Sequence, residues 1–242
     1  MFRFKQFTIR QDRTAMKVCT DACVLGAFAD VRGSTILDIG TGTGLLALMA
    51  AQRNPTARVD AVELDDAAFG QATENVANSP FADRIGVYHG AIQGYFPLHP
   101  SPLEEERGVW YDRILTNPPF YVNSLRSPDA AATRAHHAGE LPFADLVTAV
   151  GRLLAPGGQW WVLLPPVEMG QLAGLAAEAG LYQSARLLLR HHAQKPVFRV
   201  VAGFGRSSAA TVYEQMLDIY ETDGRTFTPS FRTLLQPFYL IF

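Results

Sequence analysis

The chain of 242 residues has little cysteine and no long apolar run. Its two cysteines, Cys19 and Cys23, stand four positions apart with no second cysteine pair or histidine nearby, which excludes the usual spacing of a zinc site. We expect both to be buried, reduced thiols. The longest unbroken apolar run, Leu45 to Ala51, is far below the roughly 18 residues of a membrane-spanning helix. No transmembrane helix is expected.

The first residues lack the features of an export signal. Residues Met1 to Arg13 are charged and contain no apolar stretch of the roughly 7–15 residues that forms the core of a signal peptide. With 48% apolar and 18% charged residues, the chain can bury a core of its own. These features predict a cytoplasmic protein with a basic extension over residues 1–34 packed on one domain over residues 35–242.

Charge is distributed unevenly along the chain although the net charge is only −2. The first 18 residues carry five basic side chains against Asp12, a local charge of +4, which leaves −6 for the rest. A second basic stretch, Ala179 to Tyr213, contains five Lys or Arg residues, two histidines and no acid. Two patches of one sign could form a face that binds a polyanion. The charges alone fit equally well with two separate solvated surfaces.

Apolar runs of strand length alternate with helix-like segments, which is typical of a parallel sheet wrapped by helices and predicts an α/β fold. We expect strands at Thr35–Gly40, Arg58–Leu64, Ile85–Ala91, Tyr111–Thr116 and Gln159–Leu164. We expect helices at Leu45–Arg53, Asp66–Asn78, Phe143–Leu154 and Val167–Ala179. Two closing strands are expected at Ala185–Arg190 and Phe198–Phe204. Phe96–Gly108, rich in proline and glutamate, is expected to be an exposed loop, and residues 211–242 to pack on the core.

The first motif, D-I-G-T-G-T-G over residues 38–44, lies where the first strand meets a helix. Glycines there let the backbone approach a ligand closely. The spacing of Gly40, Gly42 and Gly44 differs from the G-x-G-x-x-G pattern that holds a dinucleotide pyrophosphate, which disfavours NAD. A cofactor without that phosphate could place a cationic amino-acid moiety near Asp38, directly or through water. The alternative is a turn in which the glycines serve geometry alone.

An acid at the end of the second strand is the next feature. Glu63 follows Gly44 by 19 residues, close to the roughly 20-residue offset at which an acid meets a ribose. A carboxylate accepts hydrogen bonds from both ribose hydroxyls. Leu64 beside it and Ile92 after the third strand would give apolar walls for a flat adenine. The alternative is that Glu63 is merely a solvated acid.

The most specific motif, Asn117-Pro118-Pro119-Phe120, directly follows the fourth strand. Ligands of open α/β sheets bind at the carboxyl ends of strands. The prolines stiffen the turn and remove two backbone donors, leaving the Asn117 side-chain oxygen and the Pro118 carbonyl as acceptors. Two acceptors match the two N–H bonds of an exocyclic amine, and holding both would favour its attacking, pyramidal form. Phe120 could stack on the base. A proline-rich turn that only caps a strand is the alternative for this motif alone.

Together, D-I-G-T-G-T-G, V-E-L and N-P-P-F resemble the class I S-adenosylmethionine-dependent methyltransferases. The resemblance implies a Rossmann-like sheet of seven strands, mostly parallel with an antiparallel closing strand and helices on both faces. It implies S-adenosyl-L-methionine as the cofactor, with binding residues Asp38, Gly40, Thr41, Gly42, Gly44, Glu63, Leu64, Ala91 and Ile92. It implies catalysis by Asn117, Pro118, Pro119 and Phe120. The N-P-P-[FY] branch modifies adenine amines in DNA or RNA, guanine amines in ribosomal RNA, or a glutamine amide in release factors.

One sub-branch is more similar than the others. F-K-Q-F at residues 4–7 and D-R-T-A-M-K-V-C-T-D at 12–21 are similar to the start of the bacterial tRNA(Val) adenine-37 N6-methyltransferases, as are S-P at 79–80 and F-Y-L at 238–240. The resemblance covers nearly the whole chain. It implies methylation of the purine beside the anticodon, with no metal.

An anticodon loop presents unstacked bases, and the two basic stretches would bind its phosphates. Arg13, Lys17 and Arg199 are the candidate contacts. One departure concerns Ala91, where relatives often carry an acid for the adenine amine of the cofactor; backbone groups or water would have to substitute. The alternatives are guanine in ribosomal RNA, glutamine in a protein, or a cofactor-binding RNA module without turnover. The basic N-terminal segment argues against a protein substrate.

Overall fold

Eight strands form one sheet in the computed structural model, which describes residues 1–14, 16–96, 111–119, 141–208 and 211–242. From one edge to the other, its strands are β10 (Tyr213–Asp218), β8 (Tyr182–Arg190), β9 (Val197–Gly205), β7 (Leu154–Leu164), β6 (Tyr111–Thr116), β3 (Thr35–Ile39), β4 (Arg58–Glu63) and β5 (Ile85–His89). Neighbouring strands are parallel except around β9, which is antiparallel to both β7 and β8. The expected α/β fold, with a mostly parallel sheet and an antiparallel strand, is confirmed.

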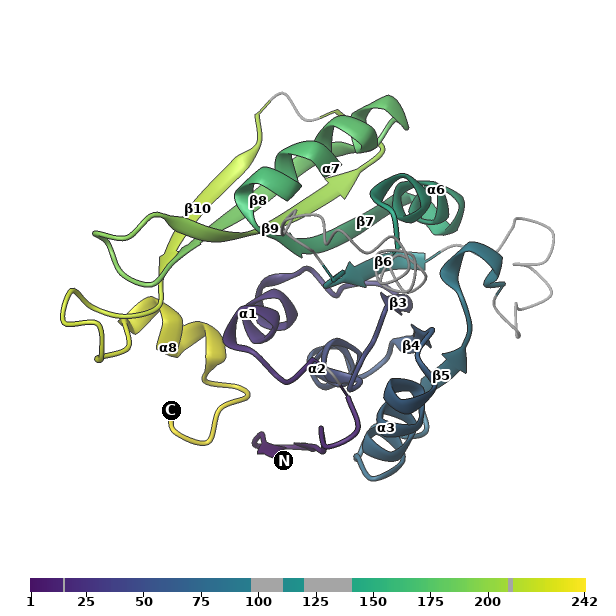
Figure 1. Cartoon of the computed structure of the whole chain (residues 1–242), viewed down its shortest axis with the longest axis horizontal. Coiled ribbons are helices and arrows are strands. Elements are labelled where there is room, and N and C mark those ends of the chain that lie inside the picture. Colours follow the sequence, from purple (N-terminus) through teal and green to yellow (C-terminus); the bar gives the residue numbers. More distant parts are fainter. Residues whose placement is uncertain (15, 97–110, 120–140, 209–210) are drawn as a thin grey trace, which may run out of the picture.

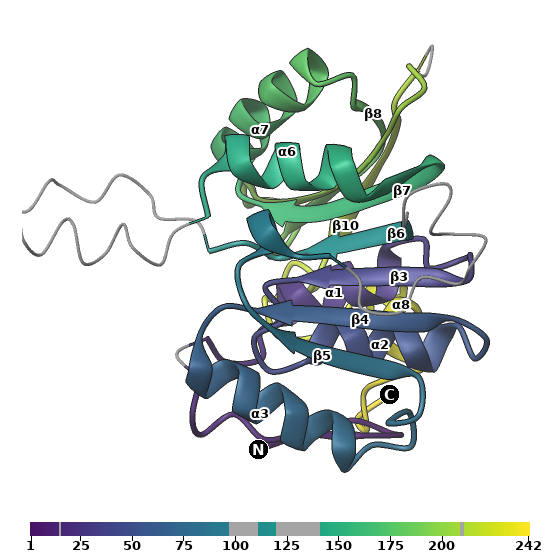
Figure 2. The ribbon, with the colours of Figure 1, turned by 90° about the vertical axis from the view of Figure 1, so that its right-hand side faces the viewer.

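The helices cover both faces of the sheet. On one face lie α1 (Thr20–Phe28), α2 (Leu45–Arg53), α3 (Asp66–Ala77) and α8 (Pro229–Leu235). The other face carries the single 3-10 turn η1 (Ile92–Gly94), α6 (Phe143–Leu153) and α7 (Pro166–Glu178) (Figures 1 and 2). Two buried apolar clusters, one per face, separate the helices from the sheet. Burial of both faces explains why the central strands read as apolar runs.

The N-terminal residues pack against the helical face that holds α2 and α8. A hairpin of β1 (Phe2–Arg3) and β2 (Thr8–Ile9) buries Phe4, Phe7 and Ile9 in that core. Phe4 also pairs with Tyr239 in an isolated bridge, so the beginning and the end of the chain lie side by side (Figure 1).

Two features of the sheet differ from the sequence prediction. β10 is an eighth strand within the segment that was expected only to pack on the core. It lies at the edge of the sheet and buries only Leu217, so its sequence has no apolar run from which a strand could be predicted. β7 begins at Leu154, five residues early, and includes the Pro156-Gly157-Gly158 stretch that was expected to be a helix-ending turn. The pairing of β6 with β7 shifts register between Tyr111 and Arg113, and this irregularity accommodates the extra residues.

The two cysteines are reduced thiols, as expected. Both cysteines are free; Cys23 is buried and Cys19 half-buried, and burial raises the pKa of each thiol to about 12. Apart from Phe96, the expected loop at 96–108 lies outside the described residues. Within the described ranges, every helix is too short or too polar to cross a membrane.

Candidate active site

A cavity of about 230 Å³ lies at the carboxyl ends of β3, β4, β5 and β6. In Figure 2 these strand ends share one side of the sheet, because the strands are parallel. Nine of the residues predicted from sequence line the cavity: Gly40, Gly42, Glu63, Leu64, Ala91, Ile92, Asn117, Pro118 and Pro119. Three of the residues predicted to bind the cofactor, Asp38, Thr41 and Gly44, are not in its wall, nor are the three basic residues predicted to bind substrate. Phe120 lies outside the described residues.

The glycine loop presents bare backbone to the cavity. Gly40 and Gly42 have φ of 68° and 58°, left-handed values that favour glycine. A Cβ added at either position would meet no atom within 4 Å, so it would project into open space beside the wall these residues form. The loop is therefore a cradle that a side chain would partly fill, as expected where a ligand approaches the main chain.

Asp38 supports this loop from behind. Its side chain is fully buried; Oδ2 accepts hydrogen bonds from Thr41 Oγ1 at 2.5 Å and Ala47 N at 3.1 Å. Oδ1 has no partner among the described residues. Burial raises the pKa of Asp38 to about 7, the nearby charge of Glu63 adds to the rise, and the two hydrogen bonds oppose it. The structure thus gives Asp38 and Thr41 a direct part in holding the loop, and any contact with a cofactor stays a prediction.

Glu63 is held rigidly at the end of β4. Its Oε2 accepts from Gly42 N at 2.7 Å, while Oε1 accepts from Leu64 N and Asp65 N, both at 2.9 Å. A carboxylate has about four acceptor positions, so these three bonds leave capacity for a ligand hydroxyl. The carboxylate also connects the glycine loop to the start of α3, which fixes the position of both.

Apolar groups form the wall that a flat ring would contact. Leu64 is 51% exposed at the cavity, whereas Ile92 is buried in η1. Ala91 brings no side-chain hydrogen-bonding group. Gln93, which sequence reasoning missed, also lines the cavity, and its Nε2 donates to Asp145 Oδ2 at 3.2 Å. A single amide in a short turn gives no sequence signal of its own.

Asn117 carries an unsatisfied acceptor. β6 places it: Thr116, the preceding residue, pairs with Ile39 on β3 and Val162 on β7, and its hydroxyl accepts from Trp160 Nε1 at 3.2 Å. Asn117 Oδ1 is buried and has no partner among the described residues. Buried amide oxygens are normally hydrogen-bonded, so an orphan in a cavity wall indicates a ligand donor.

A strap of N-terminal residues, defined here as residues 10–14 and 16–18, borders the cavity on the side of α3. Thr14 and Met16 line the cavity. Asn75, buried on α3, accepts from Arg10 N at 2.8 Å and donates to Arg10 O at 2.8 Å and to Thr43 O at 2.9 Å. Gln71, one turn earlier, accepts from Arg13 N at 3.3 Å. Sequence reasoning missed Thr14 and Met16, although both stand in the D-R-T-A-M-K segment that carried the resemblance.

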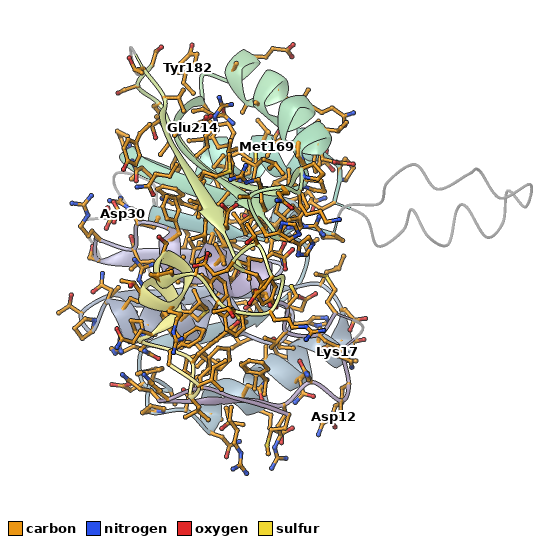
Figure 3. All side chains as sticks on the ribbon, turned by 90° about the vertical axis from the view of Figure 1, so that its left-hand side faces the viewer. Asp12, Lys17, Asp30, Met169, Tyr182 and Glu214 are labelled. Atoms are coloured by element: carbon orange, nitrogen blue, oxygen red, sulfur yellow. The ribbon has the colours of Figure 1, made fainter. Side chains whose placement is uncertain are left out.

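The three basic residues predicted to bind substrate all have internal partners. Arg13 pairs with Glu74 at 3.0 Å, and Arg199 pairs with Asp21 at 2.8 Å. Lys17 Nζ donates to the carbonyls of Gln11 and Thr14 at 2.5 and 2.7 Å, which closes the strap on itself. In Figure 3, Lys17 lies on the opposite side of the molecule from Asp30, which follows the C-cap residue of α1. Substrate contact by these three residues stays a prediction.

The site suits an organic cofactor. Among the described residues, no group of three or more His, Cys, Asp or Glu side chains is placed to hold a metal ion. The bare glycine loop, the fixed carboxylate of Glu63 and the apolar wall at Leu64 and Ile92 fit the amino-acid, ribose and adenine parts of S-adenosylmethionine. Asn117 stands in the same wall, and its buried Oδ1 has no partner among the described residues.

Comparison with known proteins agrees with this geometry. Residues 21–166 match the family model of the methyltransferase small domain. A protein of Dyadobacter fermentans named tRNA1(Val) (adenine(37)-N6)-methyltransferase is 51% identical over 100% of this chain and 98% of its own length. A protein of Tolumonas auensis with the same name is 43% identical over 99% of this chain and 96% of its own.

A solved structure shows the same fold. The crystal structure of a predicted O-methyltransferase from Agrobacterium tumefaciens superposes with a TM-score of 0.66, covering 90% of this chain and 96% of that one at 21% identity. Such a likeness concerns the fold alone, whereas the full-length identities concern the family. The chain therefore belongs to the methyltransferase small domain family, together with these two full-length relatives.

Proposed function

We propose that this protein transfers a methyl group from S-adenosylmethionine to the N6 amine of adenine 37 in tRNA1(Val). The names of its relatives supply the base and the tRNA, and the identities of 51% and 43% extend over essentially the full chain. A tRNA substrate implies that the enzyme acts in the cytoplasm. The methylated base lies in the anticodon loop of that tRNA. The observation that carries the chemistry is that Asn117 lines the cavity and its buried Oδ1 has no partner among the residues the structure describes.

The residues that hold the cofactor have distinct tasks. Gly40 and Gly42 offer backbone without side chains, and Glu63 offers acceptors to the ribose hydroxyls. Leu64 and Ile92 enclose the adenine. Bound S-adenosylmethionine supplies an electrophilic methyl group. Ala91 lacks a polar side chain, and Gln93 lines the same cavity with a side-chain amide.

Asn117 and Pro118 position the attacking amine. The lone pair of an adenine amine is delocalised into the ring, so the free amine is a poor nucleophile. Asn117 Oδ1 and the Pro118 carbonyl accept its two N–H bonds and favour a pyramidal nitrogen with an available lone pair. Proline at 118 and 119 removes backbone donors that would compete for these acceptors. The nitrogen needs no strong base before it attacks, because its proton becomes acidic only afterwards and water can accept it.

The test is methylation of unmodified total tRNA with labelled S-adenosylmethionine, followed by nucleoside analysis. The wild-type enzyme is expected to form N6-methyladenosine, and mapping is expected to place it at position 37 of tRNA1(Val). Asn117→Ala should lower the rate by about 10²–10³-fold, the cost of removing one preorganised hydrogen-bonding group, without loss of cofactor binding. Asn78→Ala is the matched control, because Asn78 caps α3 by bonding Glu74 O and does not line the cavity.

Two outcomes would overturn the proposal. Methylated guanine in ribosomal RNA or methylated glutamine in a protein, with tRNA unlabelled, would assign another substrate to the same site. Calorimetric binding of the cofactor without methylation of any of these substrates would indicate a binding module without turnover.

A further inference from the structure

The turn between β8 and β9, residues 191–196, projects from the same edge of the sheet as the cavity. Arg190 pairs with Val197, so the hairpin closes at the carboxyl end of β8. β6, β7 and β8 share one direction, so the turn lies on the side of the sheet that carries their carboxyl ends. Thr116 at the end of β6 is level with Ala202 on β9 and Arg186 on β8, so the β8–β9 hairpin extends past the end of β6 on that side. Only β7 separates β6 from β9 in the sheet order, a distance of about 10 Å at the usual strand spacing.

An exposed stack of rings marks the base of this turn. His191 lies flat on Phe198 with ring centroids 4.2 Å apart and ring planes inclined by 7°. The guanidinium of Arg199 lies 5.5 Å from the centre of the Phe198 ring. His191 is exposed, so the face of the imidazole that turns away from Phe198 is open to solvent. A supported ring with one open face is a platform on which a base can stack.

Positive charge accompanies the stack. Lys195 is exposed, and its ammonium makes no hydrogen bond or ion pair with the part of the chain that the structure describes. Two acids beside β8 and β9 are already paired, Asp218 with Arg190 and Asp21 with Arg199. The exposed Glu221 follows Tyr220, whose N–H bonds His191 O at 2.9 Å, so one acid also lies near the base of the turn. Lys195 supplies the positive charge of the turn itself.

We propose that His191, Lys195, Phe198 and Arg199, here named the β8–β9 ledge, bind a nucleotide of the same RNA on the side of the sheet that carries the cavity. The base stacks on His191, and Lys195 contacts the adjoining phosphate. Recognition of single-stranded RNA relies on such pairs of ring and cation, because loop bases are unstacked and their phosphates are accessible. The ledge rests on the proposed function, since it assigns part of the RNA surface of the same site.

The experiment measures tRNA binding and methylation in parallel for matched variants. His191→Ala should weaken tRNA binding and raise KM for tRNA by roughly 5- to 150-fold, the range expected for loss of one stacked base. His191→Phe keeps a ring on Phe198 and should stay within a few-fold of wild type. The affinity for S-adenosylmethionine and the melting temperature should be unchanged in both variants.

Charge is tested separately. Lys195→Ala should reduce the slope of log Kd for tRNA against log salt by about 0.7–0.9, the contribution of one phosphate contact. Arg58→Ala removes the same charge from an exposed position at the first residue of β4. Arg58 therefore lies at the amino ends of the parallel strands, away from the cavity, and its replacement should leave the slope unchanged.

The outcomes separate the two claims. Wild-type methylation of tRNA with unchanged KM and slope in His191→Ala and Lys195→Ala would overturn the ledge and leave the proposed function intact. Binding of tRNA that weakens in these variants, without methylation by wild type, would support the ledge and overturn the proposed function. Absence of tRNA binding by wild type would overturn both.

Discussion

Arg199 on β9 donates from Nε to the carboxylate of Asp21 at 2.8 Å, across 178 positions of sequence. Asp21 stands in the first turn of α1, directly after the strap. The pair therefore links β9, which belongs to the second basic stretch, to α1, which begins two residues after the first basic stretch ends. Whether the two stretches form one polyanion-binding face stays a prediction.

This pair should contribute measurably to stability. The two side chains are only 23% and 13% exposed, so solvent screens their bond weakly. Arg199→Ala is expected to lower the free energy of unfolding by about 1–3 kcal/mol, because it leaves a carboxylate with a lost charged hydrogen bond. Urea unfolding measures the loss. Arg225→Ala, a surface arginine elsewhere, is the control, and adding Asp21→Asn to Arg199→Ala should cost little more. An unchanged unfolding midpoint in Arg199→Ala would contradict the interpretation.

Asp38 should make stability depend on pH in an unusual direction. The unfolded chain releases the Asp38 proton near its ordinary pKa of 3.8, whereas burial holds that proton in the folded protein up to about pH 7. Between these values the folded state binds more protons than the unfolded state, so this residue makes stability fall as pH rises from about 4 to 7. Above pH 7 its contribution is constant.

Replacement of Asp38 by Asn isolates this effect. The amide can keep an oxygen for Thr41 and Ala47 and places its NH₂ where Oδ1 has no partner among the described residues. Relative to Asp38→Asn, wild type should lose stability from pH 4.5 to 7 in urea unfolding and then change no further. Asp83→Asn, at an exposed position, is the control. A pH-independent difference between wild type and Asp38→Asn would show that the buried carboxyl does not titrate in this window.

The central part of the fold could be predicted because its strands and helices carry strong local patterns. Helix α2 and strand β6 have the predicted bounds. β3 is buried at four of its five residues and β4 carries a buried Val59 and Ala61–Val62, which makes both recognisable without knowledge of their neighbours. The motifs that follow such strands lie at a common edge whenever the strands are parallel, so Gly40, Glu63 and Asn117 could be assigned to one site.

What the sequence could not predict depends on contacts between distant segments. β10 exposes four of its six residues and is a strand because β8 offers it hydrogen bonds. The strap reaches the cavity through Asn75, 65 positions from Arg10, and no local pattern reports that pairing. The sequence also could not tell whether the Asp38 side chain points into the cavity or toward α2 behind the glycine loop. A buried residue at the end of a strand is compatible with either direction.

Asn75 should couple the strap to the glycine loop. It is 2% exposed and bonds both Arg10 and Thr43, so Asn75→Ala leaves buried backbone groups unpaired. We expect the free energy of unfolding to fall by about 2–4 kcal/mol. Below the melting temperature, the affinity for S-adenosylmethionine should fall by about tenfold, which corresponds to the free energy of roughly one hydrogen bond. The reason is that Thr14 and Met16 would no longer be held in the cavity wall.

Calorimetry with folded protein distinguishes this coupling from a purely structural effect. Asn78→Ala at the end of the same helix is the control, because the Asn78 side chain donates to Glu74 O and does not line the cavity. Wild-type cofactor affinity in a destabilised Asn75→Ala would mean that the strap stabilises the fold without shaping the cofactor site.

Glu74 partly neutralises the positive charge of two arginines in the strap. Its carboxylate bonds Arg10 at 2.7 Å and Arg13 at 3.0 Å, and both arginines are more than half exposed. Glu74→Gln should change the free energy of unfolding by less than about 1 kcal/mol, because exposed ion pairs contribute little. It removes one negative charge beside two cations, so tRNA should bind about two- to fivefold more tightly at low salt, with a steeper salt dependence.

The comparison of Kd for tRNA at several salt concentrations tests whether the strap faces the RNA. Glu178→Gln, which removes an acid from the end of α7, is the charge-matched control and should have a smaller effect. Equal affinities of wild type and Glu74→Gln would place Arg10 and Arg13 away from the RNA and limit their contribution to holding the strap on α3. A gain shared equally by Glu178→Gln would reflect net charge alone, because only a local effect depends on where the acid is removed.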